Sequence, residues 1–327
     1  MAHDPDLTNP IHSPTDTFDP GLAAAFGPDL TPGGFTQPPL LRDDPSDHNF
    51  VQPSSPEMPR GADNRYQLLG EIARGGMGVV LKGRDPDLGR DLAFKVLRAE
   101  LAGKPAAVQR FIEEAQVGGQ LQHPGVVPVY DLGRFADGRP YFAMKLVKGC
   151  TLADLLAERP SPTADRGRFL QIFLQVCQTV AYAHAKGVIH RDLKPANVMV
   201  GAFGEVLVMD WGLAKVLPRG GIADEEKANL ASGGRQPPGF EEPTVIHTAR
   251  SGSGAGSETQ AGSVMGTPAY MPPEQAGGEI DQLDERADVF GLGAVLCVIL
   301  TGKPPYVADS ADAVRLMAVR GKLADAA

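Results

Sequence analysis

One short stretch of the sequence carries three side-chain types that together could handle a phosphoryl group. In the run His190–Asn197, Asp192 is followed two residues later by Lys194 and five residues later by Asn197. These residues supply a base, a cation that can neutralise phosphate, and a ligand for a metal ion. Phosphoryl transfer is catalysed mainly by positioning and charge stabilisation, so it needs such groups on one short loop. A polar loop after a helix is the alternative interpretation.

A further acidic residue follows at a suggestive distance. The tripeptide Asp210–Gly212 comes thirteen residues after Asn197, directly after an apolar strand that we predict at Val206–Met209. Taken alone, the tripeptide would be an ordinary turn, but its distance from the first motif and its place after a strand argue against a turn alone.

A glycine-rich stretch and a lysine lie earlier in the chain. The stretch Ala73–Val80 (ARGGMGVV) contains three glycines, whose missing Cβ atoms let backbone N–H groups approach a phosphate. This signal is weak on its own. Lys95 follows Gly78 by 17 residues on a predicted third strand, which suits contact with phosphates. The lysine needs an acidic partner, and the next helix offers two adjacent glutamates, Glu113 and Glu114.

Taken in this order, the motifs make the chain similar to the eukaryotic-like (Hanks-type) serine/threonine protein kinases, particularly their bacterial branch. The run His190–Asn197 matches the family's catalytic loop, H-R-D-L-x-x-x-N, at every fixed position. Asp210–Gly212 resembles D-F-G with tryptophan for phenylalanine, and Ala73 stands where G-x-G-x-x-G-x-V has its first glycine. Gly266–Glu274 resembles G-T-x-x-Y-x-A-P-E, with proline for alanine.

The resemblance implies an α+β, bilobal protein-kinase fold. Residues 65–147 would form a small β-rich N-lobe with one regulatory helix, and residues 148–327 a mainly helical C-lobe. The stretch 218–262 interrupts the resemblance, and we expect it to be a flexible insertion in the activation segment, too polar to pack. The family's last C-lobe helices have no counterpart in the sequence, so we expect an incomplete C-lobe.

The resemblance also implies catalytic roles. Asp192 would accept the proton of a substrate hydroxyl, and Lys194 would steady the γ-phosphoryl group of ATP. Lys95, paired with Glu114, would orient the α- and β-phosphates, with Glu113 as the alternative partner.

Two residues would hold the metal ion, and a larger set would surround the nucleotide. Asn197 and Asp210 would bind Mg²⁺, with Mn²⁺ as an alternative ion. Met144 would guard the back of the adenine site, next to a hinge at 145–147. The expected ATP-binding residues are Ile72, Ala73, Arg74, Gly75, Gly76, Met77, Gly78, Val80, Ala93, Lys95, Met144, Lys145, Val147 and Met199.

Regulation follows from the same resemblance. Lys194 and Thr267 are typical of serine/threonine-specific members, so we expect phosphorylation of serine and threonine hydroxyls on proteins. Arg191 is the residue type that pairs with a phosphorylated activation segment. Thr259 and Ser263 are the candidates for autophosphorylation, and Thr267 is a further regulatory candidate. A dimer of the kinase would allow this reaction in trans.

The elements that must position these residues can be predicted from periodicity and turn signals. Short strands are expected at 66–74, 78–85, 91–98, 126–134 and 139–147. A helix over 105–122 has Val108, Phe111, Ile112 and Ala115 at positions i, i+3, i+4 and i+7. Further helices are expected at 168–184, 288–300 and 311–320, and strand alternates with turn over 197–214.

Composition limits the remaining function classes. The 327 residues carry a net charge of −9, which argues against a generic nucleic-acid binder. The 39 glycines and 29 prolines are about a fifth of the chain, where roughly 12% is usual. This excess is partly explained by residues 1–64, an acidic, proline-rich tail that we expect to be disordered.

The sequence also bears on the compartment. No stretch is long and apolar enough to span a bilayer, and no secretory signal is visible. Three cysteines without a C-x-x-C pair suit a reducing compartment. We therefore expect a cytoplasmic protein, although a full-length product could be anchored to a membrane beyond residue 327.

A catalytically inactive kinase fragment or a pseudokinase-like interaction module is the alternative function. Every residue assigned to the metal, the base or the phosphates is present, which favours catalysis. The expected partners are ATP and a protein substrate.

Overall fold

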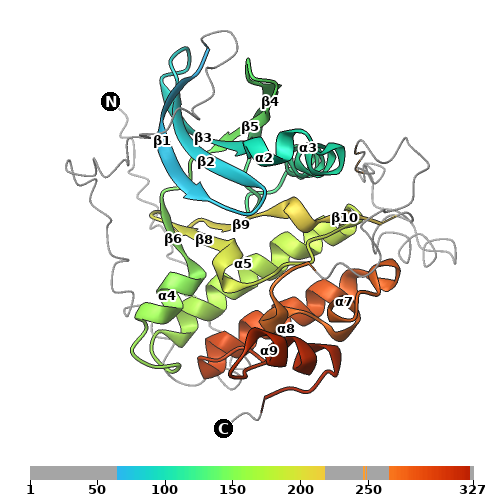
Figure 1. Cartoon of the computed structure of the whole chain (residues 1–327). Helices are drawn as coiled ribbons and strands as arrows, with labels where there is room; N and C mark the ends of the chain where they lie inside the picture. Colours follow the sequence, from blue (N-terminus) through green and yellow to red (C-terminus); the bar gives the residue numbers. More distant parts are fainter. Residues whose placement is uncertain (1–64, 218–245, 247, 249–264, 325–327) are drawn as a thin grey trace, which may run out of the picture. The chain divides into compact units, whose positions relative to one another are not determined.

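The computed structural model describes residues 65–217, 246, 248 and 265–324 (Figure 1). The predicted disordered tail at 1–64 and nearly all of the predicted insertion at 218–262 lie outside these residues. Among the described helices, none combines the length and the apolar character that crossing a bilayer requires.

A five-stranded antiparallel sheet forms the first part of the described chain, with the strand order β1-β2-β3-β5-β4. Its strands are β1 (Gln67–Arg74), β2 (Gly78–Asp85), β3 (Arg90–Leu97), β4 (Val129–Arg134) and β5 (Pro140–Lys145). The sequence-based strands agree with these bounds to within a few residues, because β-branched and aromatic residues alternate between short turns.

Alternation along β3 gives the sheet two different faces. Leu92, Phe94 and Val96 pack with Tyr141 of β5 into one apolar cluster. On the opposite face, Leu97 and Phe142 pack against a helix, so the neighbouring Lys95 also points to that side. The side chain of Lys95 is thereby aimed at the helix that carries its expected partner.

The helix on this face is α3 (Pro105–Gln120), which follows the short helix α2 (Ala99–Ala102). Pro105 occupies the first helical position, where its missing N–H costs nothing. Phe111, Glu114 and Ala115 are buried along one stripe of α3. Helical spacing therefore places Glu114 beside the apolar residues that fix α3 to the sheet.

The second part of the chain is mainly helical and holds the largest apolar cluster. Its helices are α4 (Leu152–Glu158), α5 (Arg166–Ala185), α7 (Pro273–Ala276), α8 (Glu285–Thr301) and α9 (Ala311–Val319). Val176 and Val180 of α5 and Val295 and Ile299 of α8 lie fully or almost fully buried in this cluster. This sheet part and helical part are the two lobes of the predicted bilobal fold.

Short strands connect the lobes and carry the motif loops. A three-stranded sheet of order β6-β8-β9 contains β6 (Gly149–Thr151), β8 (Val198–Gly201) and β9 (Val206–Val208). Strand β7 (Val188–Ile189) pairs with β10 (Lys215–Val216). The loop between β7 and β8 and the loop between β9 and β10 hold the two motifs, so strand pairing brings them together.

The prediction that the whole stretch 218–262 is too polar to pack is wrong at one residue. Ile246 is only 3% exposed and belongs to the same apolar cluster as Val176 and Trp211. The average composition of a segment does not show whether one of its residues is buried. Burying a single isoleucine contributes roughly 1.5–3 kcal/mol to stability, even when its neighbours in the sequence are polar.

Candidate active site

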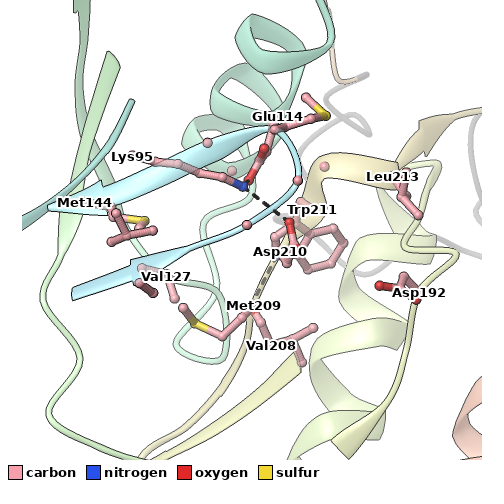
Figure 2. Close-up of a pocket in the computed structure, with 18 of the residues that line it drawn as sticks. Lys95, Glu114, Val127, Met144, Asp192, Val208, Met209, Asp210, Trp211 and Leu213 are labelled. Carbon is pink, nitrogen blue, oxygen red and sulfur yellow. Dashed lines mark hydrogen bonds and ion pairs between the residues drawn. The ribbon is translucent and has the colours of Figure 1, made fainter. Parts of the chain in front are cut away.

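Two carboxylates converge on Lys95 at the boundary between the lobes. Its Nζ lies 2.5 Å from Glu114 Oε1 and 3.3 Å from Asp210 Oδ1 (Figure 2). Of the two glutamates that the sequence offered, Glu114 is therefore the one that contacts the lysine. Glu113 instead accepts a hydrogen bond from Gln109 on its own helix at 3.5 Å.

Burial and charge act in opposite directions on these three groups. Burial alone would lower the pKa of Lys95, but Glu114 and Asp210 outweigh it and raise that pKa above its ordinary value. Burial raises the pKa of Glu114 despite the opposing effect of the lysine. For Asp210, burial is outweighed by Lys95 and then His190, which lower its pKa. Lys95 is thus a cation and Asp210 an anion at neutral pH.

The glycine-rich stretch forms the hairpin between β1 and β2 and borders the same space. Its turn is closed by a hydrogen bond from Gly75 N to Gly78 O at 2.9 Å. A Cβ at position 78 would lie 2.9 Å from the Val96 carbonyl oxygen and 3.3 Å from Lys95 Cγ. Only glycine therefore lets the hairpin lie this close to Lys95.

The loop after β7 gathers a hydrogen-bonded network around Asp192. Lys194 Nζ donates to Asp192 Oδ2 at 2.7 Å and to Thr267 Oγ1 at 2.8 Å. The backbone N–H of Thr267 donates to Asp192 Oδ1 at 3.2 Å, and its hydroxyl lies 3.3 Å from the same oxygen. A carboxylate and an ammonium group are thus fixed side by side, and Thr267 belongs to this network.

Asn197 and Asp210 are linked through the backbone between them. Asn197 Nδ2 donates a hydrogen bond to the Asp192 carbonyl oxygen at 2.8 Å. Because the amide nitrogen is used in this bond, the amide oxygen is the atom that could bind a metal ion. Met209 N donates to Asn197 O at 2.8 Å, which places Asp210 next in the chain beside it. Asp210 has φ 58° and a side chain that is 53% exposed.

This donor set fits Mg²⁺. The ion prefers oxygen ligands and is usually held by one or two protein groups, with water and substrate phosphates completing the shell. An amide oxygen and a half-exposed carboxylate supply that minimum. The described residues contain no cluster of three or more His, Cys, Asp or Glu side chains suited to a metal, so an all-protein cage is not formed there.

A buried carboxylate on α8 supports the loop from behind. Asp288 accepts hydrogen bonds from His190 N at 2.7 Å and from Arg191 N at 2.8 Å, and its Oδ2 lies 2.8 Å from His184 Nε2. Arg191 adopts φ 68°, a left-handed conformation that these contacts hold in place. The ring of His190 also lies 4.7 Å from that of Trp211, which joins the two motif loops.

A cavity of about 710 Å³ contains most of these groups. Figure 2 shows Lys95, Asp210 and Asp192 around it, with Trp211 beside Asp210 and Met144 on the side away from Asp192. The predicted site residues that line this cavity are Ala73, Arg74, Gly75, Gly76, Met77, Gly78, Val80, Lys95, Glu114, Met144, Asp192, Lys194, Asp210 and Thr267.

The residues that line the cavity differ in part from those predicted to bind the nucleotide. The lining includes Gly118, Val127 and Val129, which were not predicted, and does not include five residues of the predicted nucleotide site. Residue 118 is glycine, and a Cβ there would lie 3.1 Å from Val129 Cγ2, so the helix packs closely against Val129 at this end. The nucleotide-site residues outside the cavity are Ile72, Ala93, Lys145, Val147 and Met199, and the predicted metal ligand Asn197 and the regulatory candidate Arg191 are not among its lining residues either.

Sequence reasoning missed several lining residues because their signal is burial rather than chemistry. Val127, Val129, Phe142, Val208 and Met209 are apolar residues on or near strands, which look like ordinary core positions in a sequence. Of the regulatory candidates, Arg191 donates from Nε to Leu213 O at 2.5 Å. Thr259 and Ser263 lie outside the described residues.

Comparison with known proteins agrees with this arrangement. The model of the protein kinase domain matches residues 66–230. The serine/threonine-protein kinase PknD of Protochlamydia amoebophila is 37% identical over 260 residues, which is 76% of this chain and 24% of the relative. The serine/threonine-protein kinase PknB of Mycobacterium leprae is 38% identical over 266 residues, 80% of this chain and 36% of the relative.

A third relative extends the pattern to another genus. A probable serine/threonine-protein kinase of Streptomyces coelicolor is 37% identical over 267 residues, 81% of this chain and 34% of the relative. The chain thus spans about a third or less of the length of these curated relatives. With the bilobal fold and the match over half of its residues, the chain belongs to the protein kinase family, in the bacterial serine/threonine branch.

Proposed function

We propose that this chain transfers the γ-phosphoryl group of ATP to serine or threonine hydroxyls of a protein substrate. The observation that carries this proposal is the network of Asp192, Lys194 and Thr267, which borders the same cavity as the ion pairs of Lys95. A base for the hydroxyl and cations for the phosphates thereby face one space of about 710 Å³, within the range of small-molecule sites.

The transfer assigns one task to each group. Asp192 accepts the proton of the substrate hydroxyl, whose oxygen forms the new bond to the γ-phosphorus. The bond from that phosphorus to the β-bridging oxygen breaks, and ADP leaves with the electron pair. Lys194 neutralises charge on the γ-phosphoryl group, and Lys95, oriented by Glu114, does so on the α- and β-phosphates.

Asn197 and Asp210 would hold the divalent ion, Mg²⁺ in our proposal, with Mn²⁺ as the alternative. When bound, the ion neutralises phosphate charge. The oxygen ligands support a hard cation of this kind rather than a soft one.

The Asp192→Asn variant tests the proposed base. Asparagine keeps the shape and one acceptor oxygen but cannot take the proton, so [γ-³²P]ATP transfer to a protein substrate should fall by roughly 10²–10⁴-fold. The exposed residue Asp309 offers a matched control, since Asp309→Asn makes the same chemical change at a position that does not line this cavity. Equal, background-level labelling by the wild type and by Asp192→Asn would favour the inactive-module alternative.

Activation is the second part of the proposal. Autophosphorylation at Thr259 or Ser263 would add negative charge that could pair with Arg191, the residue type that binds a phosphorylated activation segment, and a dimer would carry out the reaction in trans. Phosphosite mapping after incubation with ATP tests this. Absence of phosphate at both residues would remove it, and a labelling rate independent of protein concentration would remove the trans reaction.

A further inference from the structure

Trp211 makes a contact that the phenylalanine of a D-F-G sequence cannot make. Its side chain is 5% exposed, and its Nε1 donates a hydrogen bond to the carbonyl oxygen of Val208 at 3.2 Å. We call this contact the indole hydrogen bond. A phenyl ring would fill the same place but carries no donor. The second motif loop of this chain therefore contains a bond that depends on tryptophan at position 211.

The indole hydrogen bond spans the residue that would hold the metal ion. Val208 and Trp211 lie on either side of Met209 and Asp210 in the chain, and Figure 2 shows the indole beside Asp210. Asp210 has φ 58°, a left-handed conformation that is uncommon for residues other than glycine. Such a conformation persists only where the surrounding contacts hold it. The indole hydrogen bond is one of these contacts.

The backbone next to it is held by further bonds from earlier parts of the chain. Val208 N donates to Gly125 O at 2.8 Å, and Met209 N donates to Asn197 O at 2.8 Å. The carbonyl oxygen of Met209 accepts a hydrogen bond from His190 Nε2 at 2.8 Å. All three partners precede the motif loop in the sequence. The position of the loop is therefore determined by residues that come before it.

The candidate phosphorylation sites lie on the other side of the loop. Thr259 and Ser263 follow Trp211 in the chain, and their phosphate would act through Arg191 in the proposed activation step. The bonds described above involve none of these three residues. Holding Asp210 in place and ordering the activation segment are therefore separable tasks.

We propose that the indole hydrogen bond holds Asp210 in its metal-binding position before the activation segment is phosphorylated. Trp211 is a positioning residue, because it acts through Asp210. Binding of a nucleotide together with Mg²⁺ is then independent of the phosphorylation state, and phosphorylation acts on other steps. This inference rests on the proposed function for the identity of the ligand, but the bond itself is tested without any ligand.

Because Trp211 is the single tryptophan of the sequence, its N–H can be removed alone. Benzothienylalanine in its place keeps the bicyclic ring and carries sulfur where indole has the N–H, whereas Trp211→Phe also reduces the ring. Hydrogen exchange is measured on phosphatase-treated protein without metal or nucleotide. The reporters are the amides of Met209, bonded to Asn197 O, and of Ala214, bonded to Trp211 O. Both replacements should speed their exchange by about fivefold, as one net hydrogen bond provides.

Ile299→Val is the control for a general loss of stability. Ile299 is fully buried in α8 and takes no part in the indole hydrogen bond. The control should speed exchange in α8 and at Met209 and Ala214 by one common factor. The two replacements of Trp211 should instead act more strongly on Met209 and Ala214 than on α8.

Calorimetric titration with ADP and Mg²⁺ connects the bond to the metal site. In the wild type, the Mg²⁺ concentration for half-maximal ADP binding should be the same for phosphatase-treated and autophosphorylated protein. Both replacements of Trp211 should raise this concentration by about threefold to fivefold in the phosphatase-treated protein, because the binding-competent conformation is less populated. The Kd of ADP without Mg²⁺ should not change.

The outcomes separate this inference from the proposed function. A wild type that needs several times more Mg²⁺ before autophosphorylation than after it would overturn the proposal. So would an unchanged Mg²⁺ requirement in both replacements, or an effect of Trp211→Phe that benzothienylalanine does not share, since ring volume would then be responsible. If no protein is phosphorylated, the proposed function fails, and hydrogen exchange and the ADP titration still decide whether the indole hydrogen bond positions Asp210.

Discussion

Asp288 provides the sharpest test of how the catalytic loop is held. Its two carboxylate oxygens accept from two different backbone donors, His190 N at Oδ2 and Arg191 N at Oδ1, and the side chain is 1% exposed. Asn at this position has one acceptor oxygen, so one backbone donor would face an NH₂ group. We therefore expect Asp288→Asn to destabilise the protein strongly.

The magnitude follows from the contacts. One buried donor left unpaired costs about 1–3 kcal/mol, and the remaining bond loses its charge assistance. Together these give about 3 kcal/mol, at the lower end for a broken buried ionic contact. With a typical urea dependence of about 2 kcal/mol per molar, the unfolding midpoint should fall by about 1.5 M.

Trp211 makes the measurement specific to this region. It is the single tryptophan of the sequence, is 5% exposed, and lies against His190. Its fluorescence therefore reports unfolding next to the loop that Asp288 supports. Asp309→Asn, at an exposed position, should change the free energy of unfolding by less than about 0.5 kcal/mol, which is a midpoint shift of less than about 0.25 M. Equal shifts for the two variants would refute the reasoning.

The pH dependence of the same variant has a defined sign. Burial would raise the pKa of Asp288, but His184, His190 and the backbone N–H of Arg191 outweigh it and lower that pKa below its ordinary 3.8. The stabilisation is then complete above about pH 4 and is lost as pH falls through the lowered value. The difference between the wild type and Asp288→Asn should therefore narrow below about pH 4.

Two further predictions concern packing. In Gly149→Ala, the new Cβ would clash with the Val200 carbonyl oxygen, so the free energy of unfolding in urea should fall by more than about 2 kcal/mol. Gly103→Ala is the control, because a Cβ there would have nothing within 4 Å, and it should change that free energy by less than about 0.5 kcal/mol. Ile246→Asp should destabilise by about 2–4 kcal/mol, since it places a charge in the main apolar cluster, and a change below 0.5 kcal/mol would show that Ile246 is not anchored there.

Local patterns in the sequence predicted most of the fold. Alternating apolar residues located the strands of the N-lobe, and helical spacing located α3, α5, α8 and α9 to within a few residues. These elements depend on neighbours along the chain, which a single sequence displays directly. The pairing of Lys95 with Glu114 joins residues 19 positions apart, and it was expected from the resemblance to the kinase family.

Features built from distant segments could not be predicted in the same way. Thr267 reaches Asp192 across 75 residues, and Ile246 joins the core from the middle of a polar stretch. Tertiary packing decides each of these, so composition and spacing contain no signal for them.

The glycine at position 118 has a consequence for how α3 is seated. A Cβ at this position would lie 3.1 Å from Val129 Cγ2, so the helix backbone packs directly against β4. Glu114 lies one helical turn earlier on α3 and contacts Lys95. The bare backbone at residue 118 therefore helps to set how closely Glu114 approaches the lysine.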